Sequence, residues 1–457
     1  MAGIGFELRR LIETRTIGGF AAAAISGSAL VAGPWLISAA SVAALQALPF
    51  LSDPIASASF TGAMVWAFAI SIVATTGPLY IFVRLSADLI YEHREAEAAD
   101  LLLRVAAALA AVSLPIGYAI GAVLAPQIPD IGLFRLSFSA LFASVNVLWA
   151  AMMTATALKR PFAVLGSYAA GMAALYALGR VLGPSHGAAG AVASLAVGYA
   201  ITASAVIVAV VLEKRPKKLS GSLALLVSYQ KRYGNLAIAG FLYALGTWCD
   251  KFFLWAEKGS SPFGTLFFSY PAYDTSFFYA SLSLIPGLVF FTIVTEIDLH
   301  LDLSRFVVFI GRRRFPDLDA ARLRLMASTR RSMLAQSLFQ FATACVAALV
   351  FPALGAAGSP VIFLLGASCF QLLLLTAVNV LFYLELYKDG RNVCAVFVGV
   401  DVLASLVSRY WIPLPDGFTY LAACIIGSAL GTALAFRGLS MADRLLYIRA
   451  SGDNYGR

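Results

Sequence analysis

The stretch IAGFLYALGTWCDK at residues 238–251 repeats a pattern found near the start of the chain, where residues 25–38 read ISGSALVAGPWLIS. Both follow Ile-x-Gly-x5-Gly-x-Trp, and the matching positions are separated by one constant offset. Helix-packing glycines can produce such a match by coincidence in a membrane chain. We favour a duplication, because the matches fall on the first helix of each predicted half. The repeat therefore predicts a chain built from two related halves.

The composition places the chain in a membrane. Of the 457 residues, 60% are hydrophobic and 12% are charged, which lies outside the range of soluble domains. Apolar stretches of about 20 residues, long enough to cross a bilayer as helices, recur along the chain. We predict an all-α integral membrane protein with twelve spans, near residues 17–47, 58–83, 101–124, 132–157, 162–183, 187–212, 234–256, 272–297, 333–354, 360–386, 392–411 and 417–437.

The spans group into two predicted lobes of six helices. The N-terminal lobe covers residues 1–212, a basic linker covers 213–233, the C-terminal lobe covers 234–437, and a tail covers 438–457. The C-terminal lobe contains a long connection at 298–332, in which LDAARLRLMAS has helical spacing. Six helices in each lobe give both lobes the same orientation across the membrane, and such repeats place a substrate path between them.

The distribution of basic residues predicts the orientation. All but five of the 33 Lys and Arg residues fall on one side of the predicted spans, so the positive-inside rule places both termini in the cytoplasm. The five exceptions are Arg135, Arg180, Lys251, Lys258 and Arg409. The basic clusters are explained by topology, although they could also attract anionic lipid or an acidic partner. The loops offer no readout element for nucleic acid, so we expect no nucleic-acid partner.

Proline and glycine pairs inside the spans are candidate helix breaks. The second helix of each half carries such a pair before a bulky apolar run, in TGPLYIFV and IPGLVFFT. A proline inside a span frees a backbone carbonyl, which is tolerated where protein or a watery cavity satisfies it. Inert helix bundles contain kinks as well. The predicted break residues are Gly33, Pro34, Gly77, Pro78, Pro286 and Gly287.

Charged residues inside the spans are candidate substrate-path residues. Burying a charge at the bilayer centre costs at least about 2.5 to 3.5 kcal/mol, so retained charges usually face a cavity or a partner. Three acids lie in the C-terminal half, at Asp250, Asp274 and Asp401. Lys251 is close enough to the outer end of its helix to reach the interface, and Asp274 is equally compatible with a helix cap. A partly acidic path and structural ion pairs both remain open.

Three arginines complete the set of candidate charges. Arg409 lies about two helical turns after Asp401, on the same face. Arg135 and Arg180 are predicted at the outer ends of adjacent helices.

The sequence favours transport over catalysis. The histidines, His93, His186 and His300, lie in predicted loops or at helix ends, and the cysteines show no CxxC spacing. The phosphate-binding motif G-x-x-x-x-G-K-[ST] is missing from the sequence, so we expect no direct use of ATP. We predict no catalytic residues, no metal site and no cofactor.

Four stretches resemble a known family. They are MAGIGFELRRLIE at the start, GPW at residues 33–35, LYALGTWCDKFFLW at 242–255 and PAYDTSFFYASLSLIPGL at 271–288. Over essentially the whole chain, the sequence is similar to the PelG family of Pel exopolysaccharide transporters of the bacterial inner membrane. This family belongs to the multidrug/oligosaccharidyl-lipid/polysaccharide flippase superfamily, so the resemblance implies two six-helix lobes arranged in a V.

The resemblance also implies a substrate and partners. The substrate would be a polymer of N-acetylated and partly deacetylated amino sugars, moved from the cytoplasm to the periplasm. The implied partners are a cytoplasmic glycosyltransferase and a cyclic-di-GMP-sensing membrane subunit, for which the segments 213–233 and 298–332 are candidate docking surfaces. We expect the acids to accept hydrogen bonds from such a polymer. We expect Trp248, Phe252 and Tyr273 to stack on its sugar rings.

Other functions remain open. A lipid-linked oligosaccharide flippase of the same fold would want cations facing its cavity, and here they are few and peripheral. A cation-coupled drug antiporter of the same fold could use Asp401 as its ion site. A non-transporting scaffold that anchors a polysaccharide synthase would need the intramembrane charges only for folding.

Overall fold

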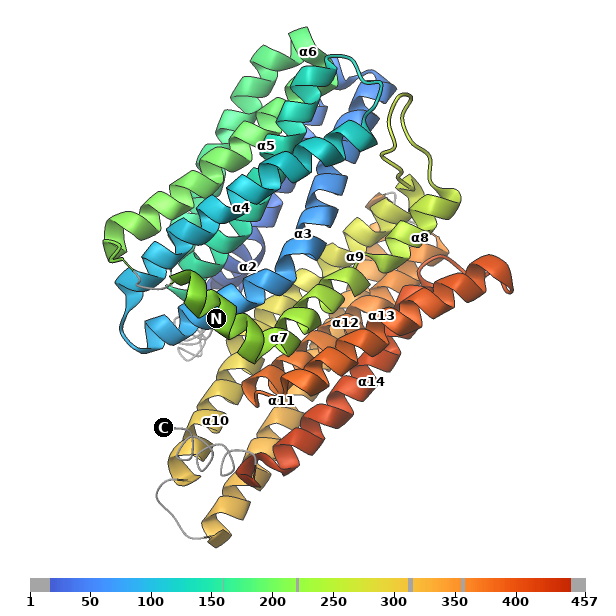
Figure 1. Cartoon of the computed structure of the whole chain (residues 1–457). Helices are drawn as coiled ribbons and strands as arrows, with labels where there is room; N and C mark the ends of the chain where they lie inside the picture. Colours follow the sequence, from blue (N-terminus) through green and yellow to red (C-terminus); the bar gives the residue numbers. More distant parts are fainter. Residues whose placement is uncertain (1–16, 159, 219–221, 311–314, 355–357, 445–457) are drawn as a thin grey trace. The chain divides into compact units, whose positions relative to one another are not determined.

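The computed structural model describes residues 17–158, 160–218, 222–310, 315–354 and 358–444. The opening segment MAGIGFELRRLIE, the GRRR run at 311–314 and residues 445–457 of the predicted tail lie outside these ranges. The described chain is helical (Figure 1), as the composition predicts. Within these ranges, extended pairing is limited to one isolated bridge between Ser260 and Ser269.

The chain divides into two compact units, as far as it is described. The first unit is Ala32–Tyr270, and the second unit combines Met1–Val31 with Pro271–Arg457. The two units are defined by which helices pack together. The lobe boundaries predicted from the sequence are defined by the repeat between the two halves of the chain. Those boundaries stay a prediction.

The first unit contains the second half of α2 and the helices up to α8. Their bounds are α2 Ile17–Gln46, η1 Pro49–Leu51, α3 Pro54–Tyr91, α4 Glu95–Leu124, α5 Ile131–Ala157, α6 Pro161–Lys214, α7 Ser222–Gly246 and α8 Cys249–Lys258. Helix α5 packs against α4 and α6, and α3 packs against α5 and α7 (Figure 1). Buried apolar side chains from α3 to α6 form one hydrophobic core, which supplies the main driving force for their association inside the protein.

Helix α6 consists of two consecutive helical stretches. They meet at Gly187, whose φ of 52° lies in a region that residues with a Cβ atom rarely adopt. The kink separates the two spans that the sequence predicts at 162–183 and 187–212. Helix α6 therefore contains both of these predicted spans.

The second unit contains the helices from α9 to α14. Their bounds are α9 Pro271–Phe290, the π-helical turn η2 Phe291–Thr295, α10 Glu296–Ile310, α11 Phe315–Val350, η3 Phe351–Leu354, α12 Ser359–Tyr383, α13 Tyr387–Tyr410 and α14 Phe418–Ser440. Helix α12 packs against α9 and α14, and α10 packs against α11. Helices α10 and α11 fill most of the connection at 298–332, and LDAARLRLMAS lies in α11, as its spacing indicates.

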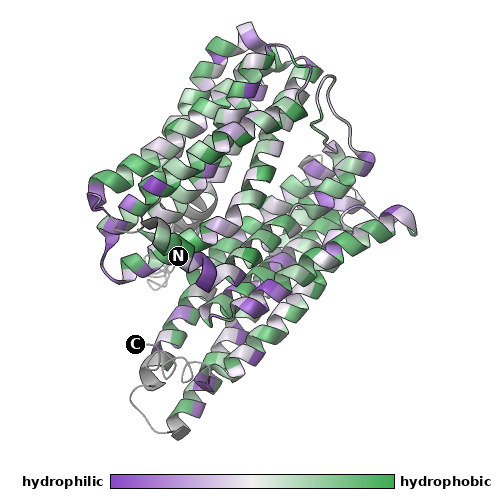
Figure 2. Cartoon of the chain, in the orientation of Figure 1, coloured by the Kyte–Doolittle hydropathy of each residue, from purple (hydrophilic) through white to green (hydrophobic). Residues whose placement is uncertain are grey.

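The helices have the length and composition of membrane spans. Among the described residues, nine helical stretches are long and apolar enough to cross a membrane, and the stretch in α6 covers two predicted spans. The remaining predicted spans fall on α2 and on α7 with α8. Figure 2 shows hydrophobic residues along most of each helix and hydrophilic residues concentrated toward helix ends. The predicted all-α integral membrane fold with twelve spans is confirmed.

Candidate functional site

The span that contains Asp250 is interrupted just before this residue. The sequence predicts one helix over 234–256, but α7 ends at Gly246 and α8 begins at Cys249. The Thr247 hydroxyl donates to the Ala244 carbonyl oxygen at 2.8 Å, which satisfies one of the acceptors left open at a helix end. Asp250 therefore lies in the first turn of a new helix, where the helix dipole favours a negative charge.

Both charges of the Asp250 and Lys251 pair are buried. Asp250 is 1% exposed and Lys251 is 7% exposed. The Lys251 ammonium does not extend freely toward the end of its helix: Nζ lies 4.5 Å from the centre of the Trp248 ring, at a distance typical of a cation–π interaction. The structure thus brings Lys251 and Trp248 together, and their place in a substrate path stays a prediction.

Four aromatic rings form a cluster that includes Trp248, the ring in contact with Lys251. The Trp66 ring of α3 lies 5.3 Å from Trp255 and 6.2 Å from Phe252, measured between ring centres. Trp248 lies 6.3 Å from Phe252 and from Trp255. Trp66, Trp248 and Phe252 are half-buried, whereas Trp255 is buried. We call these four residues the aromatic cluster.

The connection from α8 to α9, residues 259–270, holds the aromatic cluster in place. Trp66 Nε1 donates to the Phe268 carbonyl oxygen at 3.0 Å, which fixes the indole against this connection. Phe267 is fully buried and lies 6.0 Å from Phe134 and 6.1 Å from Phe138 of α5. The connection that follows α8 therefore packs against α3 and α5 of the same unit.

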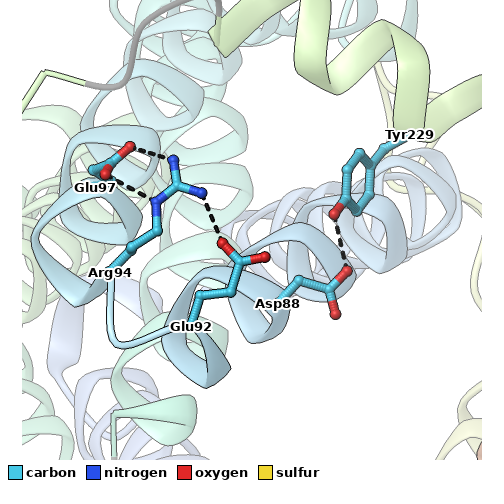
Figure 3. Close-up of polar contacts among 5 residues, drawn as sticks. All are labelled: Asp88, Glu92, Arg94, Glu97 and Tyr229. Atoms are coloured by element: carbon cyan, nitrogen blue, oxygen red, sulfur yellow. Dashed lines mark hydrogen bonds and ion pairs between the residues drawn. The ribbon is translucent and has the colours of Figure 1, made fainter. Parts of the chain in front are cut away.

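At its other end, α7 is fastened to α3. Tyr229 Oη donates to Asp88 Oδ2 at 2.9 Å (Figure 3). Tyr229 precedes the predicted span, and burial together with this hydrogen bond raises its pKa to about 12.

The turn between α3 and α4 is held by a group of charges beside this contact. Figure 3 shows Arg94 between Glu97 and Glu92. Arg94 Nη2 donates to Glu97 Oε2 at 2.7 Å, and Nη1 donates to Glu92 Oε2 at 2.7 Å. Hydrogen bonds to Glu97 and Glu92 raise the pKa of Arg94 above its usual value. Because these side chains are substantially exposed, we expect each ion pair to contribute little to stability.

The second unit holds the other predicted acids. Asp401 is fully buried on α13, and Asp274 is half-buried in the first turn of α9. Tyr273 is fully buried and lies 6.3 Å from Phe277. Phe277 in turn lies 5.8 Å from Tyr420 of α14, so aromatic rings connect α9 to α14 within this unit.

The predicted arginines occupy more peripheral positions. Arg409 is exposed in the last turn of α13, where its guanidinium carbon lies 5.5 Å from the centre of the Tyr410 ring. Arg180 is exposed on α6, and Arg135 is half-buried on α5. Their assignment to the substrate path stays a prediction.

The predicted break residues lie inside continuous helices. Gly33 and Pro34 are in α2, Gly77 and Pro78 in α3, and Pro286 and Gly287 in α9. Departures from α-helical geometry lie elsewhere, among them Gly187 in α6, Tyr233 in α7, the break between α7 and α8, and η2. A π-helical turn in a span frequently marks a functional position.

Sequence reasoning missed three polar or aromatic groups. Trp66 carries no sequence signal, because it is one aromatic residue in an apolar span. Asn146 on α5 and Gln340 on α11 are fully buried. The sequence does indicate both, because a polar amide inside a predicted membrane span is costly unless it has a partner. Gln340 Nε2 donates to the Ser283 carbonyl oxygen and to Ser368 Oγ, both at 3.1 Å, and so joins α9, α11 and α12.

The fold is that of a transporter superfamily. A MOP superfamily transporter from Pyrococcus furiosus, described as having a binding pocket of reversed polarity, is 13% identical with a TM-score of 0.59 and covers 93% of this chain and 95% of its own. The Vibrio cholerae MATE transporter VcmN in the bent form is 13% identical with a TM-score of 0.59, and covers 97% of this chain and 99% of its own. An outward-facing multidrug resistance MATE transporter is 14% identical with a TM-score of 0.54, and covers 92% and 96%.

These likenesses define the class as a multi-pass membrane protein with the MOP transporter fold. No curated protein sequence matches the chain. The family model of PelG, described as "Putative exopolysaccharide Exporter (EPS-E)", matches residues 1–447. The chain belongs to the PelG family, and with this fold it is a membrane transporter of the polysaccharide and flippase type.

Proposed function

We propose that the protein moves an amino-sugar exopolysaccharide of the Pel type from the cytoplasm to the periplasm across the bacterial inner membrane. Membership of an exopolysaccharide exporter family supports this substrate class. Both termini lie in the cytoplasm in this proposal, because the basic residues gather on that side of the spans. The protein acts as a transporter without a catalytic step of its own.

The observation that carries the proposal is the buried Asp250 at an interrupted span beside the aromatic cluster. An interrupted helix within a membrane span typically lines a substrate site in transporters. The half-buried indole rings of Trp66 and Trp248 offer apolar faces to sugar rings, and the carboxylate offers strong acceptors for hydroxyl and ammonium groups. A neutral apolar side chain at residue 250 would cost less to bury, so the retained charge supports a role in transport.

The remaining predicted residues complete the path in this proposal. Asp401 and Asp274 supply acceptors in the second unit, and Tyr273 supplies a ring. Lys251, Arg409, Arg135 and Arg180 balance the acidic charge. A cytoplasmic glycosyltransferase delivers the polymer, a cyclic-di-GMP-sensing membrane subunit regulates the complex, and both dock on the basic segments at 213–233 and 298–332.

The first experiment measures polymer export in cells that carry Asp250→Asn. We expect the variant to reach the membrane and retain its partners, while polymer at the cell surface falls strongly. Glu257→Gln is the matched control, because it removes an exposed carboxylate from the same helix α8. Normal export with Asp250→Asn would show that this charge is structural. Normal export in cells without the protein would refute the proposed function itself.

A further inference from the structure

Helix α11 is longer than a membrane span requires. It runs from Phe315 to Val350. Its last part alone, from Arg331 to Val350, rises about 28 Å, which matches the hydrocarbon core of a bilayer. The residues before Arg331 therefore extend beyond the hydrocarbon core, and Arg331 itself lies at the level of the lipid headgroups. The predicted orientation places this level on the cytoplasmic side.

One face of α11 is exposed on both sides of this level. Residues three, four or seven positions apart share a helix face. The exposed residues with this spacing are Leu323, Arg324, Ala327, Arg330, Arg331, Leu334, Leu338 and Phe341. Leu334 is 59% exposed, and Leu338 and Phe341 are each 62% exposed, as suits side chains that contact lipid acyl chains. The arginines therefore continue a surface that faces lipid. We call Arg324, Arg330 and Arg331 the arginine stripe.

The protein supplies partners to another arginine of this helix. From Ala320 to Val350, α11 carries four arginines and no acidic residue. Arg322 is half-buried: its Nη2 lies 3.0 Å from Asp319 Oδ1, and its Nη1 donates to the Ser440 carbonyl oxygen at 2.9 Å. Arg322 thus serves to hold the end of α14 against α11.

The arginine stripe differs from Arg322 in this respect. Across the described ranges, Arg324, Arg330 and Arg331 form no ion pair and no hydrogen bond. A guanidinium group presents five donors in a planar fork, which matches the oxygens of a phosphate. Three such groups on one exposed face, with no acid beside them on the helix, form a surface for an anion.

We propose that the arginine stripe binds the phosphate of an anionic membrane lipid, whose acyl chains lie along Leu334 and Leu338. Anionic lipids of the cytoplasmic leaflet attract basic residues at the membrane surface. The apolar continuation of the same face selects lipid over an acidic protein surface, because a protein outside the membrane would pair with the arginines and leave the leucines unmatched. The rest of the segment 298–332 stays available to protein partners, and the inference does not depend on the transported substrate.

The experiment measures lipid binding to the purified full-length protein in detergent by native mass spectrometry. The two probes are phosphatidylglycerol and phosphatidylcholine with identical acyl chains. We expect the wild-type protein to bind phosphatidylglycerol more tightly. The double variant Arg330→Gln, Arg331→Gln should bind it about 25-fold more weakly, because each basic residue near an anionic lipid surface contributes about a fivefold gain in affinity. Binding of phosphatidylcholine should not change.

Two further variants serve as controls. Arg305→Gln removes one exposed guanidinium from the neighbouring helix α10, where Nη1 lies 3.5 Å from Asp302 Oδ1. Because this arginine already has an acidic partner, we expect the preference for phosphatidylglycerol to persist. The double variant Arg330→Lys, Arg331→Lys keeps both charges and should keep most of the preference.

Four results would overturn the proposal. Equal binding of the two lipids by the wild-type protein would show that the arginines serve topology alone. An unchanged preference in the double Gln variant would place the lipid elsewhere. An equal loss in the Lys and Gln variants would exclude charge as the cause. A double Gln variant that keeps its lipid preference but no longer copurifies with a cytoplasmic partner would assign the arginine stripe to a protein.

Discussion

Gly77 of α3 lies against the main chain of Ala237 in α7: a Cβ atom on Gly77 would be 2.8 Å from the Ala237 carbonyl oxygen. The contact is reciprocal, because a Cβ atom on Gly240 would be 2.8 Å from Cδ2 of Tyr80. Small residues let helix backbones approach closely in membranes, where packing drives association. Gly77 and Gly240 come from motifs in different sequence halves. Close packing therefore joins a helix of one half to a helix of the other within the first unit.

This contact predicts that Gly77→Ala destabilises the protein. Overpacking costs about 1–3 kcal/mol where the neighbouring atoms belong to a backbone that cannot move aside easily. Gly166→Ala is the matched control, because a Cβ atom at residue 166 of α6 meets nothing within 4 Å. Thermal unfolding of the purified variants measures the difference. Equal unfolding temperatures would show that α3 and α7 separate without cost.

The buried amide of Asn146 predicts a second stability effect. Its Nδ2 donates to Ser113 Oγ at 2.7 Å, and its Oδ1 accepts from Ser71. Asn146→Leu removes the donor to Ser113 Oγ and the acceptor of the Ser71 hydroxyl, although Ser71 Oγ still accepts from Trp149 Nε1, so we expect a loss of about 1–3 kcal/mol. Ser144→Ala on the same helix should change little, because the Ser144 hydroxyl bonds to Ala140 of its own helix. Chemical denaturation compares the two variants, and equal midpoints would contradict a role for this network.

Phe267 predicts how strongly the connection at 259–270 is anchored. Phe267→Ala removes a fully buried ring, which typically costs about 3–5 kcal/mol. Phe263→Ala in the same connection removes a ring that is 80% exposed and should change stability by less than about 0.5 kcal/mol. Unfolding measurements and limited proteolysis at 259–270 test both. Rapid cleavage in both variants, or in neither, would argue against the anchor.

Tyr229 predicts an alkaline transition. Its pKa in the folded protein, about 12, lies above the usual tyrosine value of about 10. The contact with Asp88 therefore contributes fully below about pH 10 and is lost as the pH rises through about 12. Asp88→Asn removes the nearby negative charge and should lower the pKa of Tyr229. Tyrosinate absorbance measures the shift, with Tyr229→Phe to identify the signal, and an unchanged titration would contradict the contact.

The candidate site shows how far sequence reasoning reaches. The burial of Asp250 follows from its place in an apolar span, and the structure bears it out, whereas Lys251, which the sequence allows to reach the interface, is buried as well. The interruption before Asp250 does not follow from the sequence, because GTW at residues 246–248 is compatible with a continuous helix. The corresponding GPW at residues 33–35 does lie inside the continuous helix α2, although it contains a proline. The helix propensity of the residues alone therefore does not predict which span is interrupted. Packing against neighbouring helices decides where a helix ends.

By itself, the sequence determined the membrane environment, the helical class, the number of spans and the family. These properties depend on composition and on the length of apolar stretches, which any one segment reveals without its neighbours. The tertiary structure alone decided that Trp66 joins Phe252 and Trp255, that α7 packs on α3, and that Gln340 connects α9, α11 and α12. Each depends on contacts between segments far apart in the chain, and in a membrane every helix is apolar enough to pack in several ways. Close packing of individual side chains selects among them.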